Sequence, residues 1–155
     1  MTRWATGNEK IEQLLKDGDL QKVEASRDQA DRLIDQAFQH LNSAATLKDS
    51  DPEGAYALLY DAARKALVAC LENQGLRPTS RGGHIATIEA VRAQLDSILV
   101  GILRPCDRMR RTRRAAEYPP SGYPIISQEQ VEEDLPKAKQ IVEKMEQVLD
   151  QMDPY

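Results

Sequence analysis

The stretch DPEGAYALLYDAARKALVACLENQG, residues 51–75, decides the fold. It begins with Asp51 and Pro52, a pair typical of a helix start, because aspartate accepts a free backbone N–H and proline lacks one. It ends at Gly75, which is typical of the residue just beyond a helix. Apolar side chains occupy almost every side of the helix between these limits. The pattern therefore predicts a central helix that neighbours cover on several faces.

Similar signals on both sides of this stretch predict further helices. Thr6, Ser26 and Ser127 each precede a Glu or Gln by three residues, as in a capping box. Pro136 predicts a kink or a second helix start within the last helix. The expected helices cover residues 8–16, 27–47, 52–74, 84–96, 97–117 and 128–152.

Alternation typical of strands is absent, so we expect an all-α fold. The expected architecture is an up-and-down bundle of four to five long helices, with a short N-terminal helix added. A length of 155 residues fits one domain over residues 1–155, with a core at about 26–150.

Composition limits the classes of function. An apolar fraction of 41% excludes a disordered chain, and a net charge of −4 makes any contact with nucleic acid a local one. Cys70 and Cys106 are too few for a disulfide framework and indicate a reducing compartment. The first residues contain no apolar signal segment, and no apolar stretch is long enough to cross a membrane. We therefore expect a cytoplasmic protein without membrane contact.

The most unusual segment is RMRRTRR, residues 108–114, with five arginines in seven positions. On a helix over 97–117, an apolar arc leads into Arg113 and Glu117, which are four residues apart. An inward-facing arginine must be paired or must line a cleft. Arg104, Arg108 and Arg111 lie on the other side of this helix, and Arg110 and Arg114 flank the arc. The residues of the arc are Ile98, Leu99, Ile102, Leu103, Cys106 and Met109.

Three interpretations of this segment remain open. The arginines could form a solvated face with one structural pair, they could bind nucleic acid, or they could belong to a catalytic site. Arginine suits phosphate because its guanidinium donates two parallel hydrogen bonds. The segment itself contains no aromatic residue for base stacking, although Tyr118 follows it.

A second polar cluster is RPTSRGGH, residues 77–84, which joins two expected helices. Gly82 and Gly83 could expose backbone N–H groups to an anion, with Arg81 and His84 as further donors. The alternative is an ordinary helix stop and start, with His84 in a capping or packing role. We find no metal-ligand spacing, phosphate-binding loop or nucleophile motif, so we expect no metal and no cofactor.

Two stretches, DPEGAYALLYDAARKALVACLENQGLRPTSRGGHIATIEAVRAQL and RMRRTRRAAEYP, resemble the HEPN superfamily, and especially its small actinobacterial-type members. The resemblance covers about residues 26–150. It implies a helical bundle and a homodimer in which the arginine motifs of both chains share a cleft. Many HEPN proteins are metal-independent ribonucleases, often toxins paired with a nucleotidyltransferase antitoxin.

The motif of those ribonucleases is an arginine, four to six residues, and then a histidine. Here the fifth residue after Arg113 is Tyr118, and no histidine follows Arg111 or Arg114 at the required distance. Tyrosine is a poor general base near neutral pH, and Glu117 is only a substitute. The resemblance therefore implies a member without the usual catalytic pair.

Our leading hypothesis is a HEPN-like homodimer that binds RNA, a nucleotide or a partner protein, such as an antitoxin or nucleotidyltransferase. Arg113 would hold a phosphate or carboxylate, Glu117 would orient it, and Tyr118 would stack or hydrogen-bond. The first alternative is an active ribonuclease toxin in which Glu117 or Tyr118 replaces the histidine. The second is an interaction module with structural arginines. The candidate binding residues are Arg108, Arg110, Arg113, Arg114, Glu117, Tyr118, Arg81 and His84.

Overall fold

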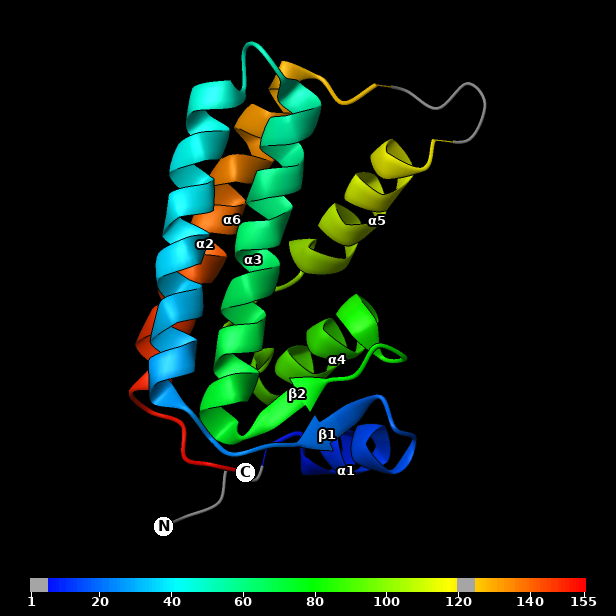
Figure 1. The fold of residues 1–155 in the computed structure, drawn as a ribbon, viewed down its shortest axis with the longest axis vertical. Coiled ribbons are helices and arrows are strands. Elements are labelled where there is room, and N and C mark those ends of the chain that lie inside the picture. The colour runs from blue at the N-terminus through cyan, green and yellow to red at the C-terminus, as the bar shows by residue number, and fades with distance from the viewer. Residues whose placement is uncertain (1–5, 120–124) are drawn as a thin grey trace.

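The computed structural model describes residues 6–119 and 125–155, and within them it contains six helices and one two-stranded sheet (Figure 1). The all-α fold class is confirmed, since each strand has only three residues. The elements in chain order are α1 (Asn8–Lys16), β1 (Leu20–Lys22), α2 (Arg27–Leu47), α3 (Pro52–Gln74), β2 (Leu76–Pro78), α4 (Gly83–Leu95), α5 (Pro105–Glu117) and α6 (Gln128–Leu149).

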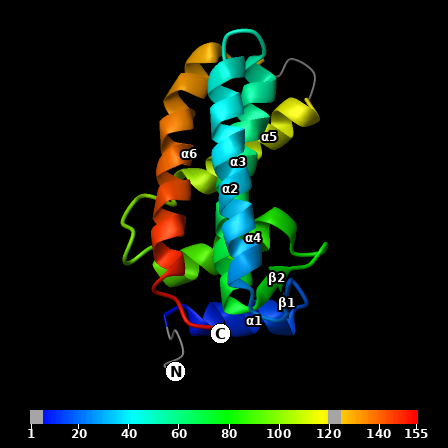
Figure 2. The ribbon, with the colours of Figure 1, turned by 60° about the vertical axis from the view of Figure 1, so that its left-hand side comes forward.

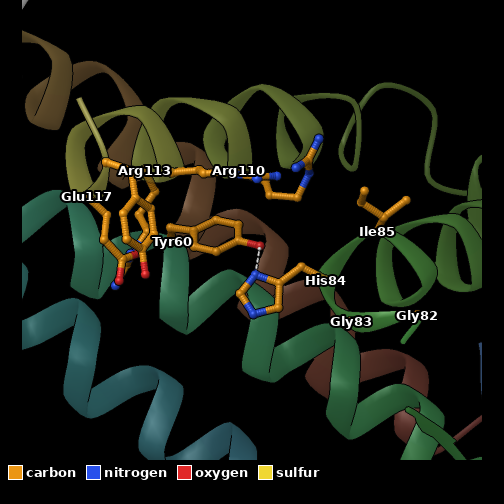
Figure 3. A pocket seen from close by; sticks show the side chains of 10 residues that line it. Tyr60, Gly82, Gly83, His84, Ile85, Arg110, Arg113 and Glu117 are labelled. Atoms are coloured by element: carbon orange, nitrogen blue, oxygen red, sulfur yellow. Dashed lines mark hydrogen bonds and ion pairs between the residues drawn. The ribbon is translucent and has the colours of Figure 1, made fainter. Parts of the chain in front are cut away.

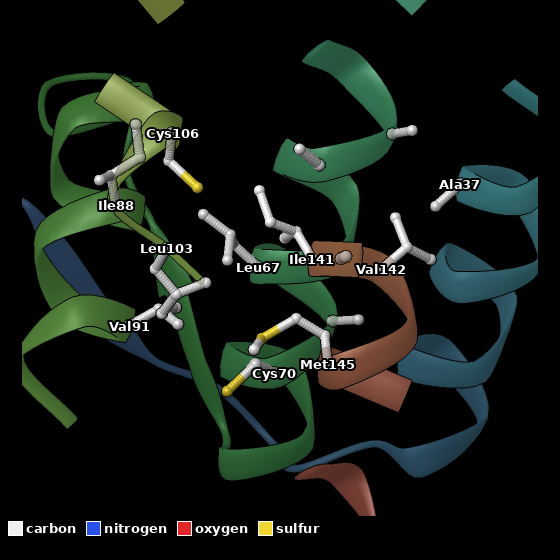
Figure 4. Packing of buried hydrophobic residues seen from close by; sticks show 14 of the residues in the cluster. Ala37, Leu67, Cys70, Ile88, Val91, Leu103, Cys106, Ile141, Val142 and Met145 are labelled. Carbon is white, nitrogen blue, oxygen red and sulfur yellow. The ribbon is translucent and has the colours of Figure 1, made fainter. Parts of the chain in front are cut away.

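The helix α3 is central, as the sequence predicts. It packs against α2, α6, α4 and α5, and the three longest helices α2, α3 and α6 run side by side (Figures 1 and 2). Its start and end are also as expected: Asp51 accepts a hydrogen bond from the Gly54 N–H at 3.0 Å, and Gly75 has a φ of 83°. Leu67 is buried between Ile141 of α6 and the residues of α4 and α5 (Figure 4).

The helices α4 and α5 lie on the side of α3 away from α2, and α5 is inclined to the long axis (Figure 1). The start of α4 is fixed by the sheet, because β1 pairs antiparallel with β2 just before it, Gln21 opposite Arg77. The sequence did not predict this sheet, since three residues are too few to show alternation. A Cβ on Gly82 would lie 2.2 Å from the Asp19 carbonyl oxygen, so the turn before α4 approaches the β1 segment closely.

The expected helix over 97–117 is wrong in its first half. The helix α5 begins at Pro105, and residues 96–104 form turns. Gly101 has a φ of 79°, which a right-handed helix cannot contain, and Pro105 lacks the N–H that a helix continuing from residue 101 would need. The predicted apolar arc also fails at Ile98, which is 56% exposed. The second half of the arc is correct, since Cys106 and Met109 are buried.

Other helix ends differ from expectation in smaller ways. The cap of α1 is Gly7 with a φ of 79°, not Thr6, and no side chain caps this end. Ser26 caps α2, and Ser127 forms the complete capping box of α6, as predicted. The expected second helix start at Pro136 is absent, because α6 runs through this residue without a break. Pro136 and Glu132, whose carbonyl loses its partner, are both exposed, so water can satisfy that oxygen.

No helix in the described part of the chain combines the length and the apolar character that crossing a membrane requires.

Candidate functional site

A buried carboxylate on α6 fixes the position of α5. Asp134 accepts one hydrogen bond of 2.8 Å on each oxygen from the Arg108 guanidinium, and another of 2.7 Å from the Tyr56 hydroxyl. The Asp134 side chain is only 4% exposed. Burial alone would raise the pKa of this carboxyl, but the hydrogen bonds from Arg108 and Tyr56 outweigh it and hold the pKa below its usual value. A charged clamp thus holds the first turn of α5 against α3 and α6.

One helical turn further along α5, Arg113 forms an ion pair with Glu117. Both side chains are partly exposed, 32% for Arg113 and 45% for Glu117. The apolar face of α5 thus leads to Arg113, as the sequence predicts. Arg113 is not a buried charge there, because it pairs with Glu117 at the surface.

The start of α4 brings His84 next to α3. His84 Nδ1 lies 2.9 Å from the Tyr60 hydroxyl, and the two rings are tilted with their centroids 5.6 Å apart. Tyr60 is 3% exposed, whereas His84 keeps an exposed face. Partial burial, followed by the nearby Arg64 guanidinium, lowers the pKa of His84 from its usual value. The imidazole is therefore mostly neutral at pH 7 and can either donate or accept a hydrogen bond.

The Arg113–Glu117 pair and the Tyr60–His84 pair line the same pocket, which has a volume of about 390 Å³ and lies between α3, α4 and α5. Arg113 and Glu117 lie at one end, His84 and the two glycines before it lie at the other, and Tyr60 lies between them (Figure 3). Six of the eight candidate binding residues meet here although they come from two segments separated in sequence, the start of α4 and the second half of α5 with the residue that follows it. The six are His84, Arg110, Arg113, Arg114, Glu117 and Tyr118.

The other two candidates lie outside the pocket. Arg108 faces α6 and is occupied by Asp134. Arg81 is 75% exposed and lies 3.3 Å from an Asp19 oxygen. Neither contributes to the pocket lining.

The charges around the pocket are unevenly balanced. Arg110 donates a hydrogen bond of 3.0 Å to Asp107, and its side chain is only 14% exposed. Arg114 has no ion-pair partner among residues 6–119 and 125–155. An anion in the pocket therefore meets Arg114, which pairs with no carboxylate in the described part of the chain, and two guanidiniums that are paired with local carboxylates.

The sequence reasoning missed three contributions to this site. Tyr60 looked like one more apolar residue of the central helix, and only the structure shows its hydroxyl beside His84. Ile85 completes the pocket wall beside Gly82 and Gly83, the two glycines that the sequence did single out. Asp134 lies outside the pocket, yet it positions the helix that carries the arginines. The sequence marks Asp134 only as an acidic residue on the otherwise apolar face of α6.

A partly buried cluster between α2 and α3 involves the other histidine. The Lys65 ammonium lies 2.7 Å from His40 Nε2, and Asp61 lies 3.9 Å from both groups. Asp61 also accepts a hydrogen bond from Arg64 at 2.8 Å. The charges that interrupt α3 thus pair with one another and with His40. Within the described ranges, no three His, Cys, Asp or Glu side chains gather closely enough to hold a metal ion.

Comparison with known proteins identifies the family. The model of the HEPN domain matches residues 30–148, which is most of the chain. This protein belongs to the HEPN domain family. No curated protein and no solved structure matches it. The matched region contains every residue that lines the pocket, together with the Arg108–Asp134 clamp, so the whole site lies within the HEPN domain.

Proposed function

We propose that this HEPN domain binds the phosphate groups of RNA or of a nucleotide in the pocket between α3, α4 and α5. The observation that carries the proposal is the meeting of Arg110, Arg113 and Arg114 with His84 in one accessible hollow. Guanidinium groups form strong, charge-assisted hydrogen bonds with phosphate oxygens. A protein with a net charge of −4 attracts polyanions only where such cations concentrate.

Two aromatic residues add contacts for the rest of the ligand. Tyr118 is 71% exposed at the rim of the pocket, where its ring can stack on a base. Tyr60 forms the buried floor, and its hydroxyl restrains the His84 ring. Phosphate and base would thus be held by different sides of the same pocket.

The proposal includes a homodimer in the cytoplasm, within a toxin–antitoxin or stress context, with an antitoxin or nucleotidyltransferase as a possible partner. Membership of the HEPN family supports this part. Light scattering tests the dimer: we expect a mass twice the 17.4 kDa of one chain, and a mass of one chain at micromolar concentration would contradict it.

We propose binding without the usual catalytic pair, and one observation favours a ribonuclease as the second candidate. His84 enters the arginine pocket from α4, although no histidine follows the arginines on α5. A mostly neutral imidazole can accept the proton of a ribose 2′-hydroxyl, whose oxygen would then attack the neighbouring phosphorus. The P–O5′ bond would break, leaving a 2′,3′-cyclic phosphate, and the 5′-oxygen would leave as a hydroxyl that takes its proton from water. His84 fits this role better than Glu117 or Tyr118, the substitutes that the sequence suggests.

One experiment separates these functions. Single-stranded RNA is titrated with wild type, Arg113→Gln and Arg111→Gln, and the products are examined on a denaturing gel in the presence of EDTA. Arg111 is the matched control, because it lies on the same helix, is 68% exposed and does not line the pocket. We expect binding that falls with salt and is lost only in Arg113→Gln. Cleavage by the wild type that His84→Gln abolishes would establish the ribonuclease. Equal binding by all three proteins, or none, would favour a module with structural arginines.

A further inference from the structure

The Arg113–Glu117 pair stands between two hollows of different charge. Both residues line the pocket described above and also a second hollow of about 290 Å³. On the pocket side the neighbours are Arg110, Arg114 and His84. On the other side they include the carboxylates of Asp51 and Glu53. An anion is therefore favoured on the first side of the pair and repelled on the second.

Glu117 is poorly placed to stabilise its own helix. It is the last residue of α5, where the partial negative charge of the helix end disfavours a carboxylate. Arginine four residues before glutamate is also the less favourable order for an ion pair along a helix. Both side chains are partly exposed, so water and salt weaken their attraction further. A stronger anion can displace Glu117 from Arg113 at little cost.

The charge of the ligand decides whether it wins this competition. With Glu117 in place, the charge of Arg113 is neutralised, and Arg110 is bonded to Asp107. A phosphodiester carries one negative charge, as Glu117 does, whereas a terminal phosphate carries between 1.5 and 2 near neutral pH, about the value known for phosphorylated side chains. The attraction to Arg113 and Arg114 scales with that charge. The carboxylates of Asp51 and Glu53 would repel the next phosphate of an RNA chain that continued past Arg113. The bound phosphate should therefore be the end of the ligand.

We propose that Glu117 is an internal competitor that occupies Arg113 until a dianionic terminal phosphate displaces it. The ligand is then a phosphomonoester, the phosphorylated end of an RNA strand or a mononucleotide, and not an internal phosphodiester. This inference rests on the proposed function of the pocket and names the ligand group that the pocket selects.

The test measures the affinity of a short fluorescent RNA carrying either a 5′-phosphate or a 5′-hydroxyl, by anisotropy at constant salt. We expect wild type to bind the 5′-phosphorylated RNA about tenfold more tightly than the 5′-hydroxyl RNA, because closely spaced guanidinium groups attract the extra negative charge. Glu117→Gln should bind both RNAs at least about threefold more tightly and should reduce the preference, since Arg113 is then available to a monoanion. Unlabelled AMP and adenosine serve as competitors. If AMP displaces the RNA and adenosine does not, the site accepts mononucleotides as well as RNA ends. If neither compound displaces the RNA, the site is specific for RNA ends.

Glu53→Gln is the matched control, because it makes the same change of charge in the neighbouring hollow without freeing Arg113. Its affinity gain should be clearly smaller than that of Glu117→Gln. The inference is overturned if Glu117→Gln binds no better than Glu53→Gln, or if both RNA ends bind wild type equally. Where RNA still binds wild type and Arg113→Gln weakens it, only the inference fails and the proposed function stands. Where neither RNA nor AMP binds wild type, both fail.

Discussion

Arg108 on α5 donates a hydrogen bond of 2.8 Å to each oxygen of Asp134 on α6, although the Asp134 side chain is almost completely buried. The two ends of this pair differ in exposure, because the Arg108 side chain is 47% exposed. Loss of the arginine leaves a buried carboxylate, whereas loss of the carboxylate leaves an arginine that water can still reach. This asymmetry links the packing of the bundle to the helix that carries the candidate site.

Replacement of Arg108 should therefore destabilise the protein more than replacement of Asp134. We expect Arg108→Met to lower the free energy of unfolding by about 3 kcal/mol, since it leaves Asp134 buried with Tyr56 as its main partner. Asp134→Asn should cost about 1–2 kcal/mol, because an amide retains the acceptor oxygen that the Tyr56 hydroxyl needs. Urea unfolding of the two variants measures the difference, and equal or reversed losses would contradict the clamp.

The same pair should make stability depend on pH in the acid range. The pKa of Asp134 is lower in the folded protein than in the unfolded chain, so the unfolded chain binds more protons as the pH falls. The contribution of Asp134 is fully present above about pH 4 and is lost progressively below it, as the pH approaches the folded pKa. Unfolding of wild type and Asp134→Asn between pH 6 and 2.5 is the measurement. The stability gap between the two proteins should narrow as the pH falls; a constant or widening gap would argue against the assignment.

Gly82 and Gly83 should respond differently to alanine. A Cβ at Gly82 would lie 2.2 Å from the backbone oxygen of Asp19, which cannot move without disturbing the sheet. Gly83 has a φ of 53° but open space around the added atom, so alanine there should cost only about 1 kcal/mol of backbone strain. We expect Gly82→Ala to destabilise the protein by more than Gly83→Ala and also to weaken RNA binding by displacing His84. Thermal unfolding and RNA titration compare the two, and a Gly82→Ala protein with unchanged stability would contradict the close approach.

Sequence patterns anticipated much of this fold because its signals are local. Asp51 and Pro52 mark the start of the central helix, Gly75 marks its end, and the apolar side chains between them predict its burial. Each of these signals depends only on residues that are close together in the sequence. The start of α5 was missed because the apolar periodicity continues through residues 97–104, although the left-handed backbone at Gly101 interrupts a helix there and Pro105 begins a new one. Periodicity records which side chains favour burial and does not record the turn that interrupts them.

The candidate site was only half visible in the sequence. The arginines of α5 and Glu117 are adjacent in the chain, so their density marks them directly. His84 and Tyr60 reach the same pocket from two other helices, and only the packing of α4 against α3 brings them together. The Arg108–Asp134 pair spans 26 residues and has no local signature. Contacts between distant segments depend on tertiary packing, which one sequence does not specify.

The protonation of His84 should tune anion binding. Because the pKa of His84 is below its usual value of 6.5, the imidazole gains its charge only as the pH falls into the acid range. Wild type should then bind RNA progressively more tightly than His84→Gln between pH 7.5 and 5. The ratio of the two affinities is the quantity to compare, because any effect of pH on the RNA itself is the same for both proteins and cancels. A ratio that does not change with pH would exclude His84 from the site.

The chain contains only two histidines, and this gives the most direct measurement of the central claim. His84 lines the pocket, and His40 lies outside it beside Lys65. Their imidazole NMR signals can be followed while AMP or a short 5′-phosphorylated RNA is added to the wild-type protein, with His84→Gln to assign them. We expect the His84 signal to shift and saturate with the ligand, while the His40 signal moves much less. A saturable shift of His40 alone, or binding that leaves His84 unchanged, would contradict a phosphate site in this pocket.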